Sequence, residues 1–192
     1  MGIKIYLSWI FIVLCVYNTL SCLAEDTVGE NHAGKAVFEI FSKGQWPQRV
    51  KASIFIEEER DKIWQVLTDY NHLSGFTPDL LGSKLIRRED DIAIIEQKNK
   101  VRILIFSKII SQEMSVKHEY PDKLIFKGTK GDMDIFEGKW ILNKVNDKGT
   151  LLTYDLKVKP NFYVPKWLFR LTFKKAVSNS LNAIRNRIIQ IN

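Results

Sequence analysis

The order of apolar and polar residues between positions 50 and 80 predicts a strand, a helix and a loop in succession. Residues 50–57 alternate apolar and polar side chains, which is the period-two pattern of a half-buried strand. From residue 59 to residue 70 the apolar side chains instead recur three and four positions apart, which is typical of an amphipathic helix. Residues 71–78 end this helix and form a loop that carries apolar side chains.

The rest of the pattern predicts an antiparallel sheet. Alternating runs occur at 35–42, 83–88, 92–97, 101–110, 112–120, 124–129, 135–145 and 150–159. From residue 83 onward, turn residues separate these runs and no helical period interrupts them, so we expect these strands to pair as hairpins with one buried face. The run at 35–42 is expected to pair with the strand that begins at residue 50. The polar residues 98–100 are interpreted as a break between two of the strands.

A long amphipathic helix is predicted at the end of the chain. Pro165 suits its first turn. The apolar stripe of this helix consists of Leu168, Leu171, Ala176, Leu181, Ile184 and Ile188. No other predicted element is large enough to cover the apolar face of the sheet. The predicted fold class is therefore α+β, with a curved antiparallel β-sheet wrapped around a long C-terminal α-helix.

Four segments in the same order resemble one protein superfamily. They are IWQVLTDYNHLSGFTPDL at 63–80, FEGKWIL at 136–142, TLLTYDLKVKP at 150–160 and NFYVPKWLFR at 161–170. They resemble the START-like (SRPBCC, Bet v 1-like) superfamily, and within it the polyketide cyclase/dehydrase and coenzyme Q-binding (Coq10-like) branch. The resemblance implies the helix-grip fold and a cavity between sheet and helix that holds a lipid, a quinone or another apolar molecule.

The first 24 residues have the pattern of a secretory signal peptide. Lys4 gives a positively charged start, residues 5–17 are apolar, and residues 22–24 resemble a cleavage site. The apolar run is shorter than the roughly 20 residues of a membrane-spanning helix. Two alternatives stay open, an uncleaved membrane anchor and lipidation of Cys22. We therefore expect an exported protein, periplasmic or membrane-associated, with a linker at 25–34 and one START-like domain at 35–192.

Composition narrows the possible chemistry. The only two cysteines, Cys15 and Cys22, lie in the first apolar segment, and the three histidines are far apart in the sequence, so we expect no metal site. No phosphate loop, nucleophile elbow or cofactor fingerprint is present, so no cofactor is expected. The net charge of +7 favours anionic partners. No nucleic-acid-binding motif accompanies this charge, so we expect no nucleic-acid partner.

Aromatic and apolar residues in three regions are the candidates for ligand contact. They lie in the loop after the first helix, on two late strands, and around the start of the last helix. The candidate ligand-binding residues are Tyr70, Phe76, Pro78, Phe136, Trp140, Tyr154, Phe162, Trp167 and Leu171. The alternative is that these side chains only fill a core. Large apolar residues in loops favour a pocket, because they need a packing partner or a ligand.

Three basic residues of the last helix are candidates for contact with a membrane surface. Lys166, Arg170 and Lys174 are spaced by four beside Trp167, so they project from one side of the helix. Basic residues next to an interfacial aromatic side chain suit an anionic membrane or a lipid headgroup. The alternative is that they form an ordinary solvated helix face.

Together these features favour a binding protein over an enzyme. The hypothesis is an exported START-like protein that holds a hydrophobic small molecule, a lipid or an isoprenoid quinone, near a membrane. The alternatives are a cyclase/dehydrase-type enzyme that acts on a polyketide-like apolar substrate in the same cavity, and a module that binds another protein. No catalytic residue is assigned, because the two clusters of titratable residues are interpreted as structural: Asp69, Tyr70 and His72, and Asp132, Asp134 and Glu137.

Overall fold

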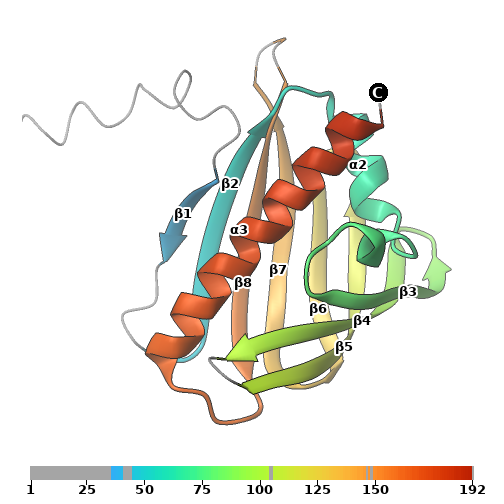
Figure 1. Cartoon of the computed structure of the whole chain (residues 1–192). Helices are drawn as coiled ribbons and strands as arrows, with labels where there is room; N and C mark the ends of the chain where they lie inside the picture. Colours follow the sequence, from blue (N-terminus) through green and yellow to red (C-terminus); the bar gives the residue numbers. More distant parts are fainter. Residues whose placement is uncertain (1–35, 41–44, 104–105, 146, 148, 192) are drawn as a thin grey trace, which may run out of the picture. The chain divides into compact units, whose positions relative to one another are not determined.

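Eight strands pair in one antiparallel sheet in the part of the chain that the structure describes (Figure 1). The structure is a computed structural model that describes residues 36–40, 45–103, 106–145, 147 and 149–191. All of them belong to one unit, Ala33–Asn192. The strands are β1 (Val37–Ile40), β2 (Gln48–Ile56), β3 (Leu80–Glu89), β4 (Ile92–Ile103), β5 (Phe106–Glu119), β6 (Lys123–Gly131), β7 (Met133–Lys144) and β8 (Thr150–Pro160).

The strand order places β2, an early strand, beside β8, the last strand. Strands β3 to β8 are neighbours in chain order, and β2 then pairs with β8, giving the order β1-β2-β8-β7-β6-β5-β4-β3. The crossover from β2 to β3 contains α2 (Arg60–Thr68) and the 3₁₀ helix η1 (Leu73–Gly75), and α3 (Lys166–Gln190) follows β8. This arrangement confirms the α+β helix-grip fold expected from the sequence.

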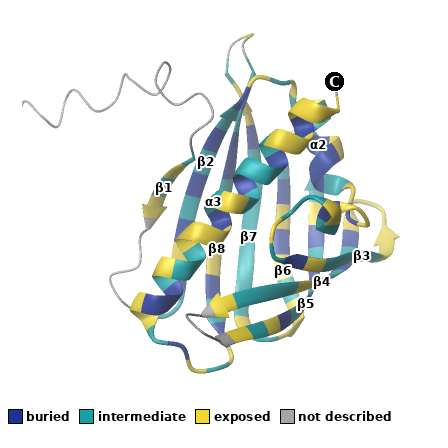
Figure 2. Cartoon of the chain, viewed as in Figure 1, coloured by how far each residue is buried: buried dark blue, intermediate teal, exposed yellow. Residues whose placement is uncertain are grey.

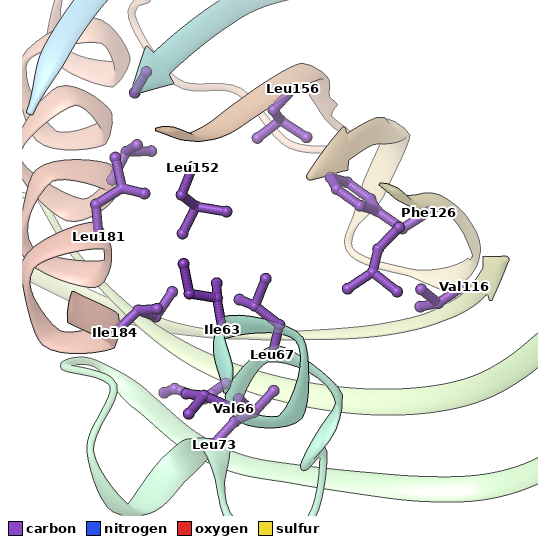
Figure 3. Packing of buried hydrophobic residues seen from close by; sticks show 14 of the residues in the cluster. Ile63, Val66, Leu67, Leu73, Val116, Phe126, Leu152, Leu156, Leu181 and Ile184 are labelled. Carbon is purple, nitrogen blue, oxygen red and sulfur yellow. The ribbon is translucent and has the colours of Figure 1, made fainter. Parts of the chain in front are cut away.

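Both helices bury one side against the same face of the sheet. In α2 the buried residues recur at helical spacing and include Ile63, Val66 and Leu67. The α3 helix crosses the sheet obliquely and packs mainly against β2, β4 and α2 (Figure 1). In Figure 3, Leu181 and Ile184 of α3 point toward Ile63 and Leu152, so sheet and both helices share one core.

Strand β4 corrects one expectation. Residues 98–100 were expected to break the strand, but β4 runs through them and its hairpin with β5 reverses after Ile103. Lys98, Asn99 and Lys100 keep their backbone partners in β5. Backbone hydrogen bonds do not depend on side-chain polarity, so a polar triplet does not end a strand by itself.

The apolar stripe of α3 is also different from the expected one. Leu171 and Ala176 are exposed, whereas Phe169 and Val177 are buried. Phe169 packs edge-on against Trp46, with ring centroids 5.1 Å apart, and stacks on Phe173. Figure 2 shows exposed positions along the outward side of the helix. The predicted signal segment and linker, residues 1–34, lie outside the described residues.

Candidate ligand-binding site

The register of β6, β7 and β8 brings four aromatic side chains into one row, which we call the aromatic row: Phe136, Phe126, Tyr154 and Trp140. Trp140 pairs across strands with Tyr154 and stacks on it, with ring centroids 4.2 Å apart. The Phe126 ring lies 5.7 Å from that of Tyr154 and 5.5 Å from that of Phe136. The row is therefore a continuous set of contacting rings that crosses three strands.

The aromatic row lies on the helix-facing side of the sheet. Leu152 and Leu156, two positions before and after Tyr154, are completely buried in the core. Side chains two positions apart in a strand point to the same face, so Tyr154 and its partner Trp140 share the face of these leucines. Phe136, Trp140 and Tyr154 are nevertheless only half-buried. The protein thus leaves part of an aromatic surface uncovered on the side where its core lies.

A glycine makes room for the row. Gly138 of β7 pairs with Phe126 of β6 and Leu156 of β8. A Cβ atom at this position would lie 2.8 Å from Cζ of Phe126 and 2.1 Å from the backbone oxygen of Asp155. Only glycine allows the Phe126 ring to lie this close to the β7 backbone.

A polar contact, the Tyr70–His118 pair, lies between α2 and the end of β5. The Tyr70 hydroxyl is 2.7 Å from Nε2 of His118, and Trp64 packs edge-on against the His118 ring. Burial raises the pKa of Tyr70, while burial and nearby Arg88 lower the pKa of His118. Both groups are therefore neutral at pH 7, and the pair offers a hydrogen bond rather than a charge.

Other polar groups near the row are also uncharged. Burial raises the pKa of the Tyr154 hydroxyl, which keeps it protonated. Gln112 of β5 is buried, and its Oε1 has no hydrogen-bond partner among the described residues, whereas its Nε2 donates to the carbonyl of Glu113 at 3.0 Å. A buried face with hydroxyl and amide groups and no free charge suits an uncharged apolar ligand.

The nine predicted ligand residues fall in several places. Phe136, Trp140 and Tyr154 meet in the aromatic row, and Tyr70 lies in the core beside His118. At the α2–β3 loop, Phe76 is half-buried near the guanidinium of Arg187 and Pro78 is exposed. Phe162 is half-buried beneath the ammonium group of Lys108. Trp167 and Leu171 are exposed on α3 and are not part of the row.

The predicted membrane residues lie on the first turns of α3. Lys166 and Lys174 are exposed, and the Lys174 ammonium is 5.6 Å from the centroid of the Phe38 ring. Arg170 is half-buried beside them. The three residues thus lie on the same part of the helix as Trp167 and Leu171.

Three residues of the site were not among the candidates. Phe126 had a signal in the sequence, because the alternation in residues 124–129 puts it on the face of Leu124. The contact of His118 with Tyr70 joins positions far apart in the chain, and no local sequence pattern predicts it. Gln112 belongs to the same strand face as Met114 and Val116, but only the structure shows its unpaired oxygen.

The acidic residues that were considered for catalysis have structural partners. Asp69 pairs with exposed His72, Asp134 with Lys159, and Glu137 with Lys157. A carboxylate oxygen of Asp132 accepts a hydrogen bond from the backbone N–H of Ser111 at 2.9 Å. Each of these four carboxylates therefore has a partner within the protein.

No group of three or more His, Cys, Asp or Glu residues within the part of the chain that the structure describes is arranged to hold a metal ion. None of the helices in this part of the chain combines the length and the apolar character needed to cross a membrane.

Comparison with known proteins supports this interpretation of the fold. The sequence profile of the family described as polyketide cyclase/dehydrase and lipid transport matches residues 56–185. A search of the curated protein sequences gives no match.

Several solved structures are similar to this chain at low identity. A STAR-related lipid transfer protein from Xanthomonas axonopodis aligns with a TM-score of 0.68 at 16% identity, covering 82% of this chain and 96% of that one. A START superfamily protein from Mycobacterium smegmatis gives 0.66 at 15% identity, covering 75% and 99%. The Zhui aromatase/cyclase from Streptomyces sp. R1128 gives 0.65 at 9% identity, covering 74% and 93%. These likenesses concern the fold, and the profile match spans more than half of the sequence: this chain belongs to the polyketide cyclase/dehydrase and lipid transport family.

Proposed function

We propose that this protein binds a hydrophobic small molecule, a lipid or an isoprenoid quinone, with its apolar part against the aromatic row and beneath α3. The observation that carries the proposal is the half-buried state of Phe136, Trp140 and Tyr154 on the helix-facing side of the sheet. Aromatic surface left uncovered next to a core is stabilised when an apolar ligand removes it from water. The polar groups described beside the row, the Tyr154 hydroxyl and the Gln112 amide, carry no charge, which favours a ligand without charge at its buried end.

Membership of the family agrees with this class of ligand. The similar protein from Xanthomonas axonopodis is named a lipid transfer protein, and the family description includes lipid transport. A quinone is included in the proposal because four sequence segments resemble the coenzyme Q-binding branch.

The test is native mass spectrometry of the chain expressed with its first 24 residues, followed by organic extraction of the bound material. We expect an apolar adduct at one molecule per chain. Trp140→Ala should lose the adduct, and Lys139→Ala should retain it. Lys139 precedes Trp140 in the same strand and points to the opposite face, so it is a matched control.

An unliganded mass would be followed by a second measurement. Phosphatidylcholine, phosphatidylglycerol and ubiquinone would each be added, and the midpoint of thermal unfolding would be recorded. A ligand that binds the folded state raises this midpoint. If no apolar molecule binds in either experiment, the proposed function is overturned.

Export and membrane association are also part of the proposal. They rest on the signal-like pattern of residues 1–24. Cell fractionation and N-terminal sequencing of the purified protein test them. A mature chain that begins at Glu25 supports cleavage, retention in the membrane that is lost in Cys22→Ser supports lipidation, and an intact chain in the cytoplasm contradicts export.

An enzyme of the cyclase/dehydrase type is the second candidate function. The neutral Tyr70–His118 pair favours it, because a hydroxyl and an imidazole in hydrogen-bond contact can transfer a proton. Turnover of a polyketide-like substrate that is lost in Tyr70→Phe, with binding of that substrate retained, would support it. Equal turnover by wild type and Tyr70→Phe would exclude this pair from catalysis.

A further inference from the structure

The corner between β8 and α3, residues 162–175, exposes large apolar side chains. Tyr163 is 92% exposed, Trp167 64% and Leu171 65%. Trp167 and Leu171 are four residues apart, so they lie on one face of α3, and Lys174 continues that face. The opposite side of the same turns is already occupied, because Leu168 and Phe169 are buried. The exposed residues are therefore an additional apolar surface and not a misplaced part of the core.

The charge on helix α3 has one sign. Helix α3 carries Lys166, Arg170, Lys174, Lys175, Arg185 and Arg187 and no acidic residue. Lys166, Lys174 and Lys175 are exposed next to Trp167 and Leu171. Such a helix attracts anionic groups and lacks the acidic residues that would balance it.

The corner is also hollowed. A hollow of about 770 Å³ lies there, and its lining includes Trp46, Phe162, Tyr163, Lys166, Trp167 and Arg170. Asp134 also borders the hollow, where its carboxylate is neutralised by Lys159 at 2.8 Å. Cationic side chains and aromatic rings thus border the same space. A phosphate-bearing headgroup can contact the cations while its glycerol and first methylene groups contact the rings.

Aromatic rings with a polar tip and flanking Lys or Arg side chains are the combination that suits a bilayer interface. Tyr and Trp rings lie at the headgroup level, and basic residues are drawn to anionic lipids. A protein partner would need acidic residues and a complementary apolar surface of its own, whereas an anionic bilayer supplies both features everywhere.

We infer that residues 162–175 form a docking surface for a bilayer that contains anionic phospholipid. Tyr163, Trp167 and Leu171 enter the interface, and Lys166 and Lys174 contact headgroup phosphates. The inference deepens the proposed function and rests on it, because a protein that carries a lipophilic molecule must exchange it with a membrane.

The test is flotation of the purified protein with two kinds of vesicle. One contains phosphatidylcholine alone, and the other contains phosphatidylcholine with about 30 mol% phosphatidylglycerol. We expect binding to the anionic vesicles that weakens as the salt concentration rises, and little binding to the neutral ones. The double variant Trp167→Ala/Leu171→Ala should bind the anionic vesicles at least about tenfold more weakly. Both side chains are exposed, so the double variant should unfold at the temperature of the wild type.

Matched controls separate the effect of this surface from the effects of exposed apolar area and net charge elsewhere on the protein. Leu81→Ala truncates an apolar side chain of similar exposure, 54%, on β3. Lys84→Glu/Lys127→Glu changes the net charge as much as Lys166→Glu/Lys174→Glu does, at exposed positions on β3 and β6. Both controls should bind vesicles nearly as the wild type does, whereas Lys166→Glu/Lys174→Glu should not.

The results distinguish the docking surface from the proposed function. Vesicle binding that is absent in the wild type, or that survives the Trp167 and Leu171 substitutions, overturns the docking surface. If the wild type self-associates, does not bind vesicles, and loses its self-association in these variants, the surface is a contact between copies of the chain. That result also overturns the docking surface. Native mass spectrometry of the same variants should still show the adduct, and a missing adduct in a wild type that binds vesicles contradicts the ligand proposal alone.

Discussion

The Tyr70–His118 pair couples the stability of the domain to pH. Burial lowers the pKa of His118 below its ordinary value, so the folded state binds fewer protons than the unfolded chain at mildly acidic pH. The stabilisation is complete above about pH 6.5, the unperturbed histidine value, and is lost as the pH falls toward and through the lowered pKa. Wild type should therefore lose more stability between pH 7.5 and 5 (roughly the range in which histidine titrates) than His118→Gln does.

Urea unfolding of both proteins at the two pH values checks this expectation. Equal losses in wild type and His118→Gln would show that other groups cause the acid sensitivity. Tyr70→Phe tests the partner, because it leaves Nε2 of His118 without its hydrogen bond. We expect it to lower the free energy of unfolding at pH 7 (neutral) by about 1–3 kcal/mol.

The Arg49–Asp155 pair affects stability in a lower pH range than His118 does. Arg49 donates two hydrogen bonds to the Asp155 carboxylate, at 3.0 and 2.8 Å, and these hydrogen bonds hold the pKa of Asp155 below its usual range. This stabilisation is present above about pH 4, the unfolded value, and is lost as the pH falls through the lowered pKa.

Asp155→Asn should therefore lower the free energy of unfolding by about 1–3 kcal/mol near neutral pH. The difference from wild type should stay constant between about pH 5 and 8 and shrink only at lower pH. Asp134→Asn removes a more exposed pair with Lys159 and should cost at most about 1 kcal/mol. A similar loss in both variants would contradict the special role of the half-buried pair. The midpoints of urea unfolding at several pH values measure the loss of stability in each variant.

At the scale of the elements, the sequence pattern predicts most of the fold and misses the details that need register. The pattern located α2, α3 and the run of antiparallel strands, because helical and strand periods are local. It placed a break at residues 98–100, where only the pairing with β5 shows that the strand continues. It also assigned Leu171 to the apolar stripe of α3, because the pattern of one helix does not show which face meets the sheet.

The same reasoning applies to the site. Phe136, Trp140 and Tyr154 were candidates because alternation puts large side chains on one face of each strand, and the register brings them into contact. Their role in ligand binding stays a prediction. The contact of Tyr70 with His118 depends on how α2 lies against β5, which a local pattern does not contain.

A substitution at Gly138 tests how tightly β7 packs against the aromatic row. Gly138→Ala should destabilise the domain by about 1–3 kcal/mol, the usual cost of overpacking, because the new Cβ would meet both the Phe126 ring and the β8 backbone. Gly82→Ala is the matched control, since no atom lies within 4 Å of the corresponding Cβ in β3. Equal effects in thermal or urea unfolding would show that the aromatic row moves aside easily.

At the scale of the whole molecule, two kinds of apolar surface meet on the helix-facing side of the sheet. Leu152 is completely buried and contacts other core residues. Trp140 packs against the same core but remains half-buried. If the aromatic row were only a core, both side chains would stabilise the ligand-free protein and no ligand would change the comparison.

A comparison of Leu152→Ala and Trp140→Ala decides between these roles. In the ligand-free protein, Leu152→Ala should cost about 2–5 kcal/mol and Trp140→Ala less, because water already reaches part of its ring. An apolar ligand at 100 times its dissociation constant adds about 2.7 kcal/mol to the stability of a protein that binds it. Leu152→Ala should keep most of this increment and Trp140→Ala should lose it. Urea unfolding with and without the extracted ligand measures both terms, and an equal ligand increment in the two variants would mean that the aromatic row is core and that the ligand binds elsewhere.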